Sequence, residues 1–252
     1  MHYFSVCAMF KNEAAGLKEW LDHYLFHGAD HFYLVNDQST DNSLEVLAPY
    51  ISKGLITLIR LDWPRVPHRQ SQIYTHAFLP RLPETRWMCV CDVDEYVWSP
   101  RCVDLKEVLR SCEGLSQIQI RQTIFGSNGL LSQPESIVQG FTMRRANQNG
   151  TSIDHGYKYI IQNTYTFKRL DVHFAEPTEE TEATKTWLII NEDWFVLNHY
   201  KCQSLEHWRE VKCTRGDADE FTSRSHEDFA RVDINEVSDT RLAAQNSMME
   251  KI

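Results

Sequence analysis

Three acidic side chains follow a short apolar segment near the middle of the chain. Asp92, Asp94 and Glu95, called the acidic cluster below, come directly after the apolar residues 87–91. A run this short and apolar is typical of a strand buried on both faces, and Asp is a poor strand former, so we expect the strand to end where the acids begin. Carboxylates one residue apart repel each other unless a cation lies between them. Such oxygen-rich groups suit Mg²⁺ or Mn²⁺, above all when substrate phosphates complete the coordination. A solvated Asp-x-Asp turn would look the same in sequence, so the rest of the chain decides between the two interpretations.

The composition indicates a folded protein with an acidic surface. The chain has 252 residues, of which 42% are apolar, which suffices for one large domain or two small ones. Its net charge of −9 disfavours binding to nucleic acid or to anionic membranes. Seven cysteines form an odd set without zinc-like spacing, as expected of reduced thiols. The apolar run at 3–10 is too short to span a membrane and lacks a basic flank. We therefore expect a cytoplasmic protein, or one peripheral at the inner face of a membrane, with no integral membrane segment.

Apolar periodicity predicts alternating strands and helices in the first half of the chain. The expected strands are 3–10, 32–35, 55–61 and 87–91, and the expected helices are 17–25, 44–51 and 69–79. This β-α-β-α-β-α-β order predicts a mostly parallel sheet with right-handed crossovers. Ligands of such sheets bind beyond the carboxyl ends of the strands, where the acidic cluster is expected. No glycine-rich phosphate loop follows any strand, which argues against ordinary dinucleotide and P-loop sites.

The second half of the chain is less regular. Asp104 predicts the start of a helix that runs through Leu109, and the acidic stretch 176–182 predicts a solvated loop. The charged residues 217–252 predict a peripheral helical extension. Strands are expected at 117–121, 157–161, 165–170, 186–190 and 194–197, and a further helix with Leu205, Trp208 and Lys212 on one side ends at Gly216.

An ordered set of motifs resembles one group of enzymes. The group is the family 2-like and family 92-like glycosyltransferases, whose catalytic domains have the GT-A fold, and the resemblance covers most of residues 3–216. The residues that carry it are Lys11-Asn12-Glu13, Trp20, Asn36-Asp37-Gln38-Ser39-Thr40-Asp41, Trp87 with Asp92-Val93-Asp94-Glu95-Tyr96, Phe125-Gly126-Ser127-Asn128-Gly129, Lys158, His173, Asn198-His199-Tyr200, Ser204, Trp208 and Lys212.

The resemblance implies a fold, a domain division and a reaction. It implies a single GT-A domain over 1–216, with a Rossmann-like nucleotide half at 1–98, a mixed acceptor half at 99–216 and the extension at 217–252. The implied reaction is inverting transfer of a sugar from a nucleotide-sugar donor, a UDP-sugar, to a hydroxyl of a glycan or glycolipid acceptor. A divalent cation, Mn²⁺ or Mg²⁺, would stabilise the diphosphate leaving group as its charge grows.

The resemblance also implies roles for particular residues. Asp94 would bind the metal, Asp92 would contact the metal or the donor ribose, and His199 would complete the metal site from a late strand. Asp37 would read the base or the ribose, although an Asx turn would place an Asp there as well. The other residues expected to bind the nucleotide sugar are Asn12, Glu13, Arg69, Gln72, Lys158 and Lys212.

The catalytic base is the least determined part of the expected site. Direct displacement with inversion needs a group that takes the acceptor proton as the hydroxyl attacks. Glu176 and Asp154 are the two carboxylates we favour equally, and His173 is a third group downstream of the acidic cluster. The sequence provides no geometry that separates them.

Three other functions use the same residues. A sugar nucleotidyltransferase would open with a glycine-rich basic loop, where this chain has Lys11-Asn12-Glu13-Ala14-Ala15. A two-metal phosphohydrolase or nuclease could use the acidic cluster, but it would not explain the polar loop at 36–41. A non-catalytic carbohydrate-binding module would have no need of the acids and His199 together.

Overall fold

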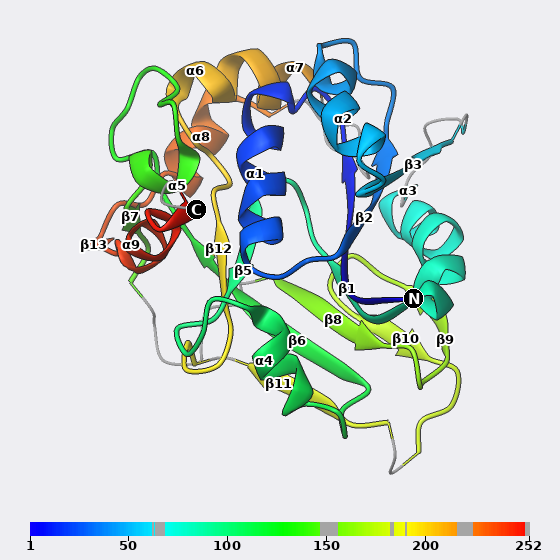
Figure 1. Ribbon diagram of the computed structural model, residues 1–252. Coiled ribbons are helices and arrows are strands. Elements are labelled where there is room, and N and C mark those ends of the chain that lie inside the picture. Colours follow the sequence, from blue (N-terminus) through cyan, green and yellow to red (C-terminus); the bar gives the residue numbers. More distant parts are fainter. Residues whose placement is uncertain are drawn as a thin grey trace.

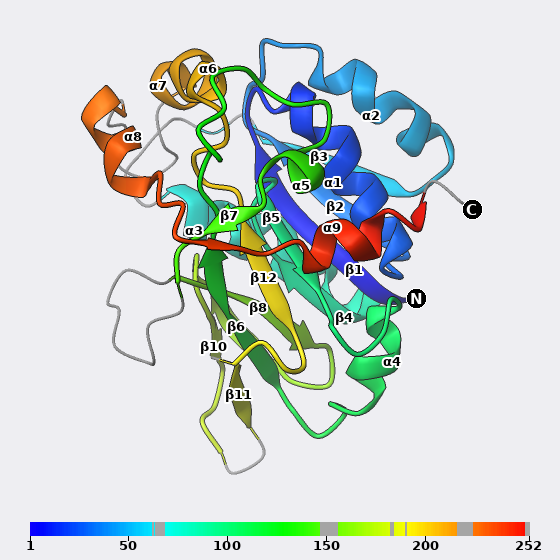
Figure 2. The same ribbon diagram turned by 90° about the vertical axis from the view of Figure 1, so that its left-hand side faces the viewer.

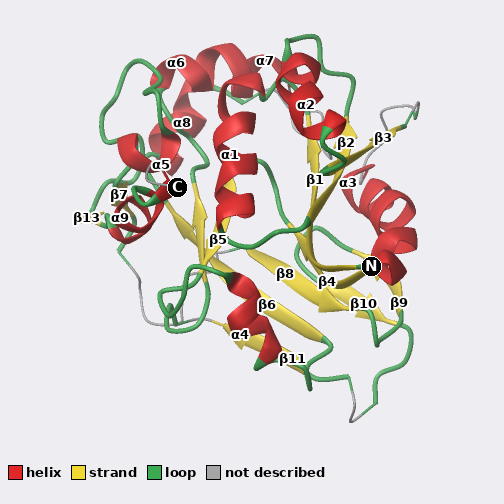
Figure 3. Cartoon of the chain, in the orientation of Figure 1, coloured by secondary structure: helices red, strands yellow, loops and turns green. Residues whose placement is uncertain are grey.

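The computed structural model describes residues 1–61, 63, 69–146, 156–181, 184–189, 191–215 and 224–249 (Figure 1). A central sheet has helices packed on its faces, and the helices alternate with strands in the first half of the chain (Figures 1 and 3). Within the described residues, no helix is both long enough and apolar enough to cross a membrane.

The elements of the first half follow the predicted order. They are β1 (His2–Phe10), α1 (Ala14–Phe26), β2 (His31–Asn36), α2 (Ser43–Ser52), β3 (Ile56–Arg60), α3 (Arg69–Ile73), the π-helical η1 (Tyr74–Phe78), the 3₁₀-helical η2 (Leu79–Glu84), β4 (Thr85–Val90) and β5 (Glu95–Trp98).

The second half contains more and shorter elements. They are α4 (Leu105–Arg110), β6 (Gln117–Ile124), α5 (Ile137–Gly140), β7 (Met143–Arg144), β8 (Tyr157–Gln162), β9 (Phe167–Leu170), β10 (Ala175–Pro177), β11 (Thr186–Ile189), β12 (Val196–His199), α6 (Leu205–His207), the π-helical η3 (Trp208–Lys212), α7 (Cys213–Arg215), α8 (His226–Val232), β13 (Val237–Ser238) and α9 (Arg241–Asn246).

The central sheet combines a parallel and a mixed half. Its order is β3-β2-β1-β4-β8-β6-β12-β5, and β11 pairs with β6 beside this path. The strands β3, β2, β1 and β4 are parallel, which confirms the α/β class and the largely parallel sheet. β8 runs antiparallel to β4 and β6, and β12 is parallel to β6 but antiparallel to β5. The carboxyl ends of β1, β2, β4 and β12 therefore lie at one edge of the sheet, together with the amino ends of β5 and β8.

Alternate residues of the central strands pack on opposite faces of the sheet. Val6 and Cys89 belong to the larger apolar core, which includes residues of α1, α4 and α9. Cys7 and Val90 belong to a second core, which includes residues of α3, η1 and β9. Because both faces of the sheet are covered, the residues on both sides of these strands are apolar. This packing fixes the position of the parallel strands and of the polar residues that follow their carboxyl ends.

Two predicted elements differ in the structure. The helix expected at 69–79 is a sequence of short helical segments continuing to Glu84, where Pro80 and Pro83 lack the N–H that a regular α-helix would need. The acidic stretch that was expected to be a loop begins within β10, which pairs antiparallel with β9. The strand β5 was not predicted, because it is only four residues long.

The C-terminal residues contact the rest of the chain at several places, although α8 has no buried residue. β13 pairs with β7, and Asp233 accepts hydrogen bonds from the backbone N and the Oγ of Ser127 at 2.7 and 2.9 Å. Figure 2 shows α9 packed beside α1. On α9, Leu242 is buried in the larger apolar core. The described residues 224–249 therefore belong to the same domain as the sheet.

One buried amide connects α9 to α1, and its removal should destabilise the domain. Asn246 lies within hydrogen-bonding distance of His27 Nε2 at 2.9 Å and of His23 Nδ1 at 3.1 Å, and all three residues are buried. We expect Asn246→Ala to lower the free energy of unfolding by about 1–3 kcal/mol, because buried ring nitrogens lose their partner. Urea denaturation measures this change, with the exposed Ser247→Ala as control. Equal stability of the two variants would contradict the packing described above.

Candidate active site

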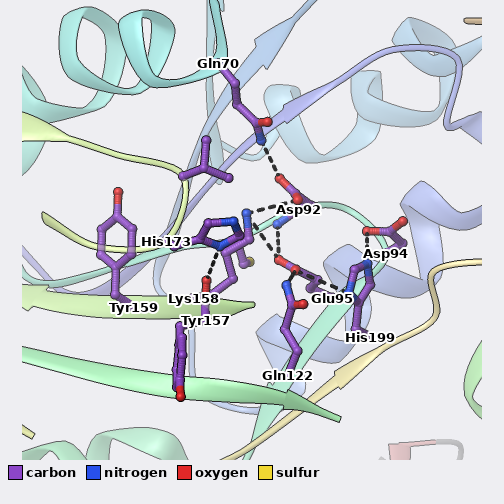
Figure 4. A network of polar contacts seen from close by, with 12 residues as sticks. Gln70, Asp92, Asp94, Glu95, Gln122, Tyr157, Lys158, Tyr159, His173 and His199 are labelled. Carbon is purple, nitrogen blue, oxygen red and sulfur yellow. Dashed lines mark hydrogen bonds and ion pairs between the residues drawn. The ribbon is translucent and has the colours of Figure 1, made fainter. Parts of the chain in front are cut away.

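Asp92 is held in place by neutral donors on one oxygen and by an ammonium group on the other. Its Oδ1 accepts hydrogen bonds from Gln70 Nε2 at 2.9 Å and from the Tyr74 hydroxyl at 2.8 Å. Its Oδ2 lies 3.0 Å from the buried Nζ of Lys158 at the start of β8. Burial alone would raise the pKa of Asp92, but Lys158 outweighs burial and the pKa is lowered. Asp92 is therefore an ionised carboxylate that remains partly accessible to a ligand (Figure 4).

Glu95 is the completely buried member of the acidic cluster. Its Oε2 accepts from the backbone N of Asp92 at 2.7 Å and lies 3.7 Å from Lys158 Nζ, and its Oε1 accepts from Gln122 Nε2. Burial raises the pKa of Glu95 to about 7, although Lys158 acts in the opposite direction. Trp20 and Tyr24 of α1 donate to its backbone oxygen at 3.0 and 3.1 Å. Glu95 therefore fixes the turn between β4 and β5 and has no surface for a ligand.

Asp94 meets residues from two distant parts of the chain. Its Oδ2 lies 2.6 Å from Lys212 Nζ on η3, and its Oδ1 lies 3.5 Å from His199 Nε2 at the end of β12. Lys212 Nζ is also 3.9 Å from Glu13 Oε1 in the loop after β1. Burial would raise the pKa of Asp94, but Lys212 and His199 hold it well below its usual range. The pairing His199–Glu95 in the β12–β5 ladder explains why a residue a hundred positions away reaches the acids.

These residues fit a divalent cation only if a substrate supplies further ligands. Asp94 Oδ1 and His199 Nε2 are two potential metal-ligating atoms that face each other. The ring Nδ1 of His199 is buried without a hydrogen bond. Among the described residues, no group of three or more His, Cys, Asp or Glu is placed to hold a metal ion. The donor set therefore suits an ion such as Mg²⁺ or Mn²⁺, which takes its remaining ligands from water and phosphate oxygens.

Asp37 lies at the end of β2 and forms a buried ion pair. Arg69 Nη1 donates to Asp37 Oδ1, and both side chains are almost inaccessible to solvent. Arg69 Nη2 also donates to the backbone oxygen of Trp63 at 3.2 Å. The resemblance implied that Arg69 contacts the donor; in the structure its guanidinium pairs with Asp37, and contact with the donor stays a prediction. The contacts assigned to the Asp37 side chain within the described residues use one of its two carboxylate oxygens.

The loop after β1 is joined to the loop after β2. Asn12 has a φ of 53°, an uncommon value that Asn tolerates better than most residues, and its Oδ1 accepts from Thr40 N at 2.8 Å. In return, Ser39 Oγ accepts from Asn12 N at 3.0 Å, and Asp41 Oδ2 accepts from Ala14 N at 2.9 Å. These bonds hold Glu13 and Asp37 at the same sheet edge, so Asn12 organises the loops through its own hydrogen bonds.

Substitution of Arg69 should weaken binding of a donor more than it slows the chemical step. We expect Arg69→Met to leave the Asp37 carboxylate buried and unpaired, which typically costs about 3–5 kcal/mol of stability. In the folded fraction, KM for a nucleotide donor should rise more than kcat falls, because Asp37 lies two strands away from the acidic cluster. Steady-state kinetics below the melting temperature measures this, with the exposed Arg81→Met as control. An unchanged KM would show that Asp37 takes no part in donor binding.

Three other predicted site residues lie away from the cluster or outside the described chain. Gln72 is exposed, and its neighbour Gln70 is the residue that donates to Asp92. Glu176 pairs with Lys168 at 2.8 Å and with Arg169 at 3.2 Å on the β9–β10 hairpin, and its pKa is lowered by Lys168. Asp154 falls outside the described residues.

Sequence reasoning missed the neutral residues that orient the acids. Gln70, Tyr74 and Gln122 bind Asp92 or Glu95. The alternation of apolar and polar residues in 117–121 predicts that Gln122 shares a sheet face with Ile118 and Ile120. This alternation was the one sequence pattern that indicated a buried side chain at position 122. Nothing in the sequence distinguished Gln70 from Gln72.

One protein-family model matches nearly the whole chain. The model of glycosyltransferase family 92 matches residues 2–242. A family 92 protein of Oryza sativa subsp. japonica is 24% identical over 213 residues, which are 83% of this chain and 35% of that protein. One from Arabidopsis thaliana is 24% identical over 80% of this chain and 36% of its own length. The chain thus spans about a third of the length of these curated relatives.

Two further similarities are weaker. An Arabidopsis thaliana galactan beta-1,4-galactosyltransferase is 27% identical over 113 residues, which are 42% of this chain and 22% of that protein. The crystal structure of S. aureus TarS in complex with UDP aligns with a TM-score of 0.45 and 15% identity, over 78% of this chain and 60% of that one. Because the family model covers far more than half of the sequence, the assignment rests on that match. This chain belongs to glycosyltransferase family 92.

Proposed function

We propose that this domain transfers a sugar from a nucleoside diphosphate donor, a UDP-sugar, to a hydroxyl of a glycan or glycolipid acceptor with inversion at the anomeric carbon. The observation that carries the proposal is the meeting of Asp94 and His199 at 3.5 Å, from two strands that end at the same sheet edge. Asp37 ends a third strand at that edge, so the site offers metal ligands at one end and a buried acceptor oxygen at the other.

A divalent cation held by Asp94 and His199 would stabilise the charge that develops on the diphosphate leaving group. The chain supplies positive charge of its own beside this position. Lys158 and Lys212 are buried ammonium groups, within 3.0 Å of Asp92 and 2.6 Å of Asp94. Their positive charge favours the approach of a diphosphate to an edge that carries the acidic cluster together with Glu13 and Asp37. Asp92, with one oxygen fixed by Gln70 and Tyr74, would orient donor hydroxyls at the same place.

Base recognition would fall to Asp37. Its carboxylate is paired with Arg69 and would accept a hydrogen bond from the base. The N3–H of uracil is a donor, whereas N3 of cytosine is an acceptor. A carboxylate aimed at the base edge therefore favours uridine over cytidine diphosphates.

The first test is binding. Thermal stabilisation should be measured with UDP, UDP-galactose, UDP-glucose and UDP-N-acetylglucosamine, each with Mn²⁺ or with EDTA, and with CDP and GDP as controls. The similarity to a galactan galactosyltransferase makes UDP-galactose the first donor to assay. We expect UDP compounds to raise Tm only with metal present, followed by slow donor hydrolysis. Failure of every nucleotide to bind with Mn²⁺ would refute the proposal.

A phosphohydrolase is the alternative that the same acids allow. It would release phosphate from simple phosphoesters and would not depend on Asp37. Release of sugar and intact UDP from the donor would therefore favour the transferase, whereas cleavage of the diphosphate itself would favour the hydrolase.

A further inference from the structure

His173 reaches the strand end that carries Lys158, although it belongs to a distant turn. It is an exposed residue between β9 and β10, and its Nδ1 is 2.9 Å from the backbone oxygen of Tyr157 at the start of β8. Figure 4 shows this bond, which joins the imidazole to the strand that supplies Lys158 to Asp92. Tyr157 immediately precedes Lys158, so the same strand end positions the imidazole and the ammonium group.

Gly156 lies next to both the ring of His173 and the side chain of Gln122. A Cβ added at Gly156 would lie 3.0 Å from His173 Cε1 and 2.8 Å from Gln122 Oε1. The amide of Gln122 in turn donates to Glu95. His173 and a residue that holds Glu95 therefore border the same glycine, where a side chain would crowd both.

The hydrogen bond to Tyr157 determines which ring nitrogen can accept a proton. A carbonyl oxygen only accepts, so Nδ1 must carry the hydrogen in this contact. In the neutral ring, Nε2 is then unprotonated, with its lone pair directed away from β8. Within the described part of the chain, the bond to Tyr157 is the only hydrogen bond assigned to this ring. This arrangement is the one a general base requires, since one nitrogen is fixed and the other is free.

The neighbouring carboxylates are less suited to the same task. Asp92 and Asp94 are each engaged by an ammonium group, Asp92 by Lys158 at 3.0 Å and Asp94 by Lys212 at 2.6 Å. Glu95 is completely buried and cannot reach an acceptor. Glu176 is occupied by Lys168 and Arg169 on the hairpin. Among the described groups near the cluster, His173 alone combines exposure with a free lone pair.

We propose that His173 is the catalytic base of the transfer reaction. The acceptor oxygen forms the new bond to the anomeric carbon while its proton passes to Nε2 of His173. The bond from the anomeric carbon to the diphosphate oxygen breaks, and its electron pair leaves with the nucleoside diphosphate. The resulting imidazolium is held by Tyr157 and releases its proton to solvent after the product departs. This inference rests on the proposed function and assigns one further role within it.

The experiment compares an acceptor that must lose a proton with one that carries none. Water is the first acceptor, measured as hydrolysis of the donor that binds in the screen above, with Mn²⁺ present. Azide is the second, measured as formation of the glycosyl azide. For His173→Gln we expect hydrolysis to fall about 10²–10⁴-fold. The azide reaction should stay within about threefold of the original chain, because no proton has to be removed.

His76→Gln is the matched control, because His76 is also exposed and its Nδ1 lies 2.8 Å from a backbone oxygen, that of Gln72. It should change neither reaction. Unchanged hydrolysis in His173→Gln would overturn the assignment, and so would an equal loss of both reactions, which indicates a positioning role. An azide-rescued defect in Asp154→Asn but not in His173→Gln would move the base to Asp154. If the original chain turns over no nucleotide sugar, the proposed function itself is refuted, and the role of His173 with it.

Discussion

Asp94→Asn should reduce sugar transfer by about 10³-fold or more while the domain remains folded. The substitution keeps the shape of the side chain but removes the charge that pairs with Lys212 at 2.6 Å and faces His199 at 3.5 Å. A metal ion bound there supplies several kcal/mol of charge stabilisation in the transition state, and each 1.36 kcal/mol corresponds to a factor of ten in rate. The loss should appear in kcat and in the metal concentration that gives half-maximal activity.

The matched control for this prediction is Asp104→Asn. Asp104 caps α4 by accepting from Lys106 N at 2.9 Å, and an asparagine oxygen can accept the same bond. We expect this control to retain transfer, and both variants to keep their near-ultraviolet circular dichroism. Activity of Asp94→Asn within tenfold of the original chain at saturating Mn²⁺ would exclude Asp94 as a metal ligand.

The sequence was sufficient to locate the sheet edge that carries the site. Parallel strands place their carboxyl ends together, so polar residues after strands at 3–10, 32–35 and 87–91 had to meet. The meeting of these three strand ends needed only strand direction, which apolar runs reveal well. His199 was added from the resemblance to the glycosyltransferase group, which implied a histidine at the end of a late strand.

Side-chain partners at the same edge could not be derived in this way. Arg69 was expected to contact the donor, and the sequence did not indicate that its guanidinium would pair with Asp37. Gln70 and Gln72 differ by two positions on a segment that changes from α- to π-helix, so helical periodicity could not decide which one faces Asp92.

The C-terminal residues illustrate a different limit. Their sequence is charged and weakly periodic, which is typical of a solvated helix. In the structure, their contacts are largely polar, such as those of Asp233 with Ser127 and of Asn246 with two histidines. Hydrogen bonds between distant residues leave no periodic pattern in a sequence, so burial of this segment was not predictable.

Lys158→Met should produce a large loss of stability, and the loss should depend on pH. Lys158 is 1% exposed and faces Asp92 at 3.0 Å and Glu95 at 3.7 Å. Its removal leaves two carboxylates without a cation, one of them fully buried. Breaking a buried ion pair in this way costs about 3–5 kcal/mol at neutral pH. The control is Lys168→Met, whose exposed pair with Glu176 is screened by solvent, so its loss should change stability far less.

The sign of the pH dependence follows from Glu95. Burial raises its pKa from 4.5 to about 7 in the folded protein, so the proton is bound more tightly when folded. Its contribution to stability is therefore complete below pH 4.5 and is lost as pH rises through 7. Without Lys158, which lowers this pKa, the carboxyl should stay protonated to higher pH. We thus expect the loss in free energy of unfolding of Lys158→Met to be smallest near pH 5 and to grow as pH approaches 8, as measured by urea denaturation across that range.

The double variant Lys158→Met with Glu95→Gln is the control for this pH dependence. Its loss in free energy of unfolding should be smaller and nearly independent of pH, because the buried titrating group is gone. A deficit of Lys158→Met that is flat across the same range would show that Glu95 is not the group that Lys158 balances.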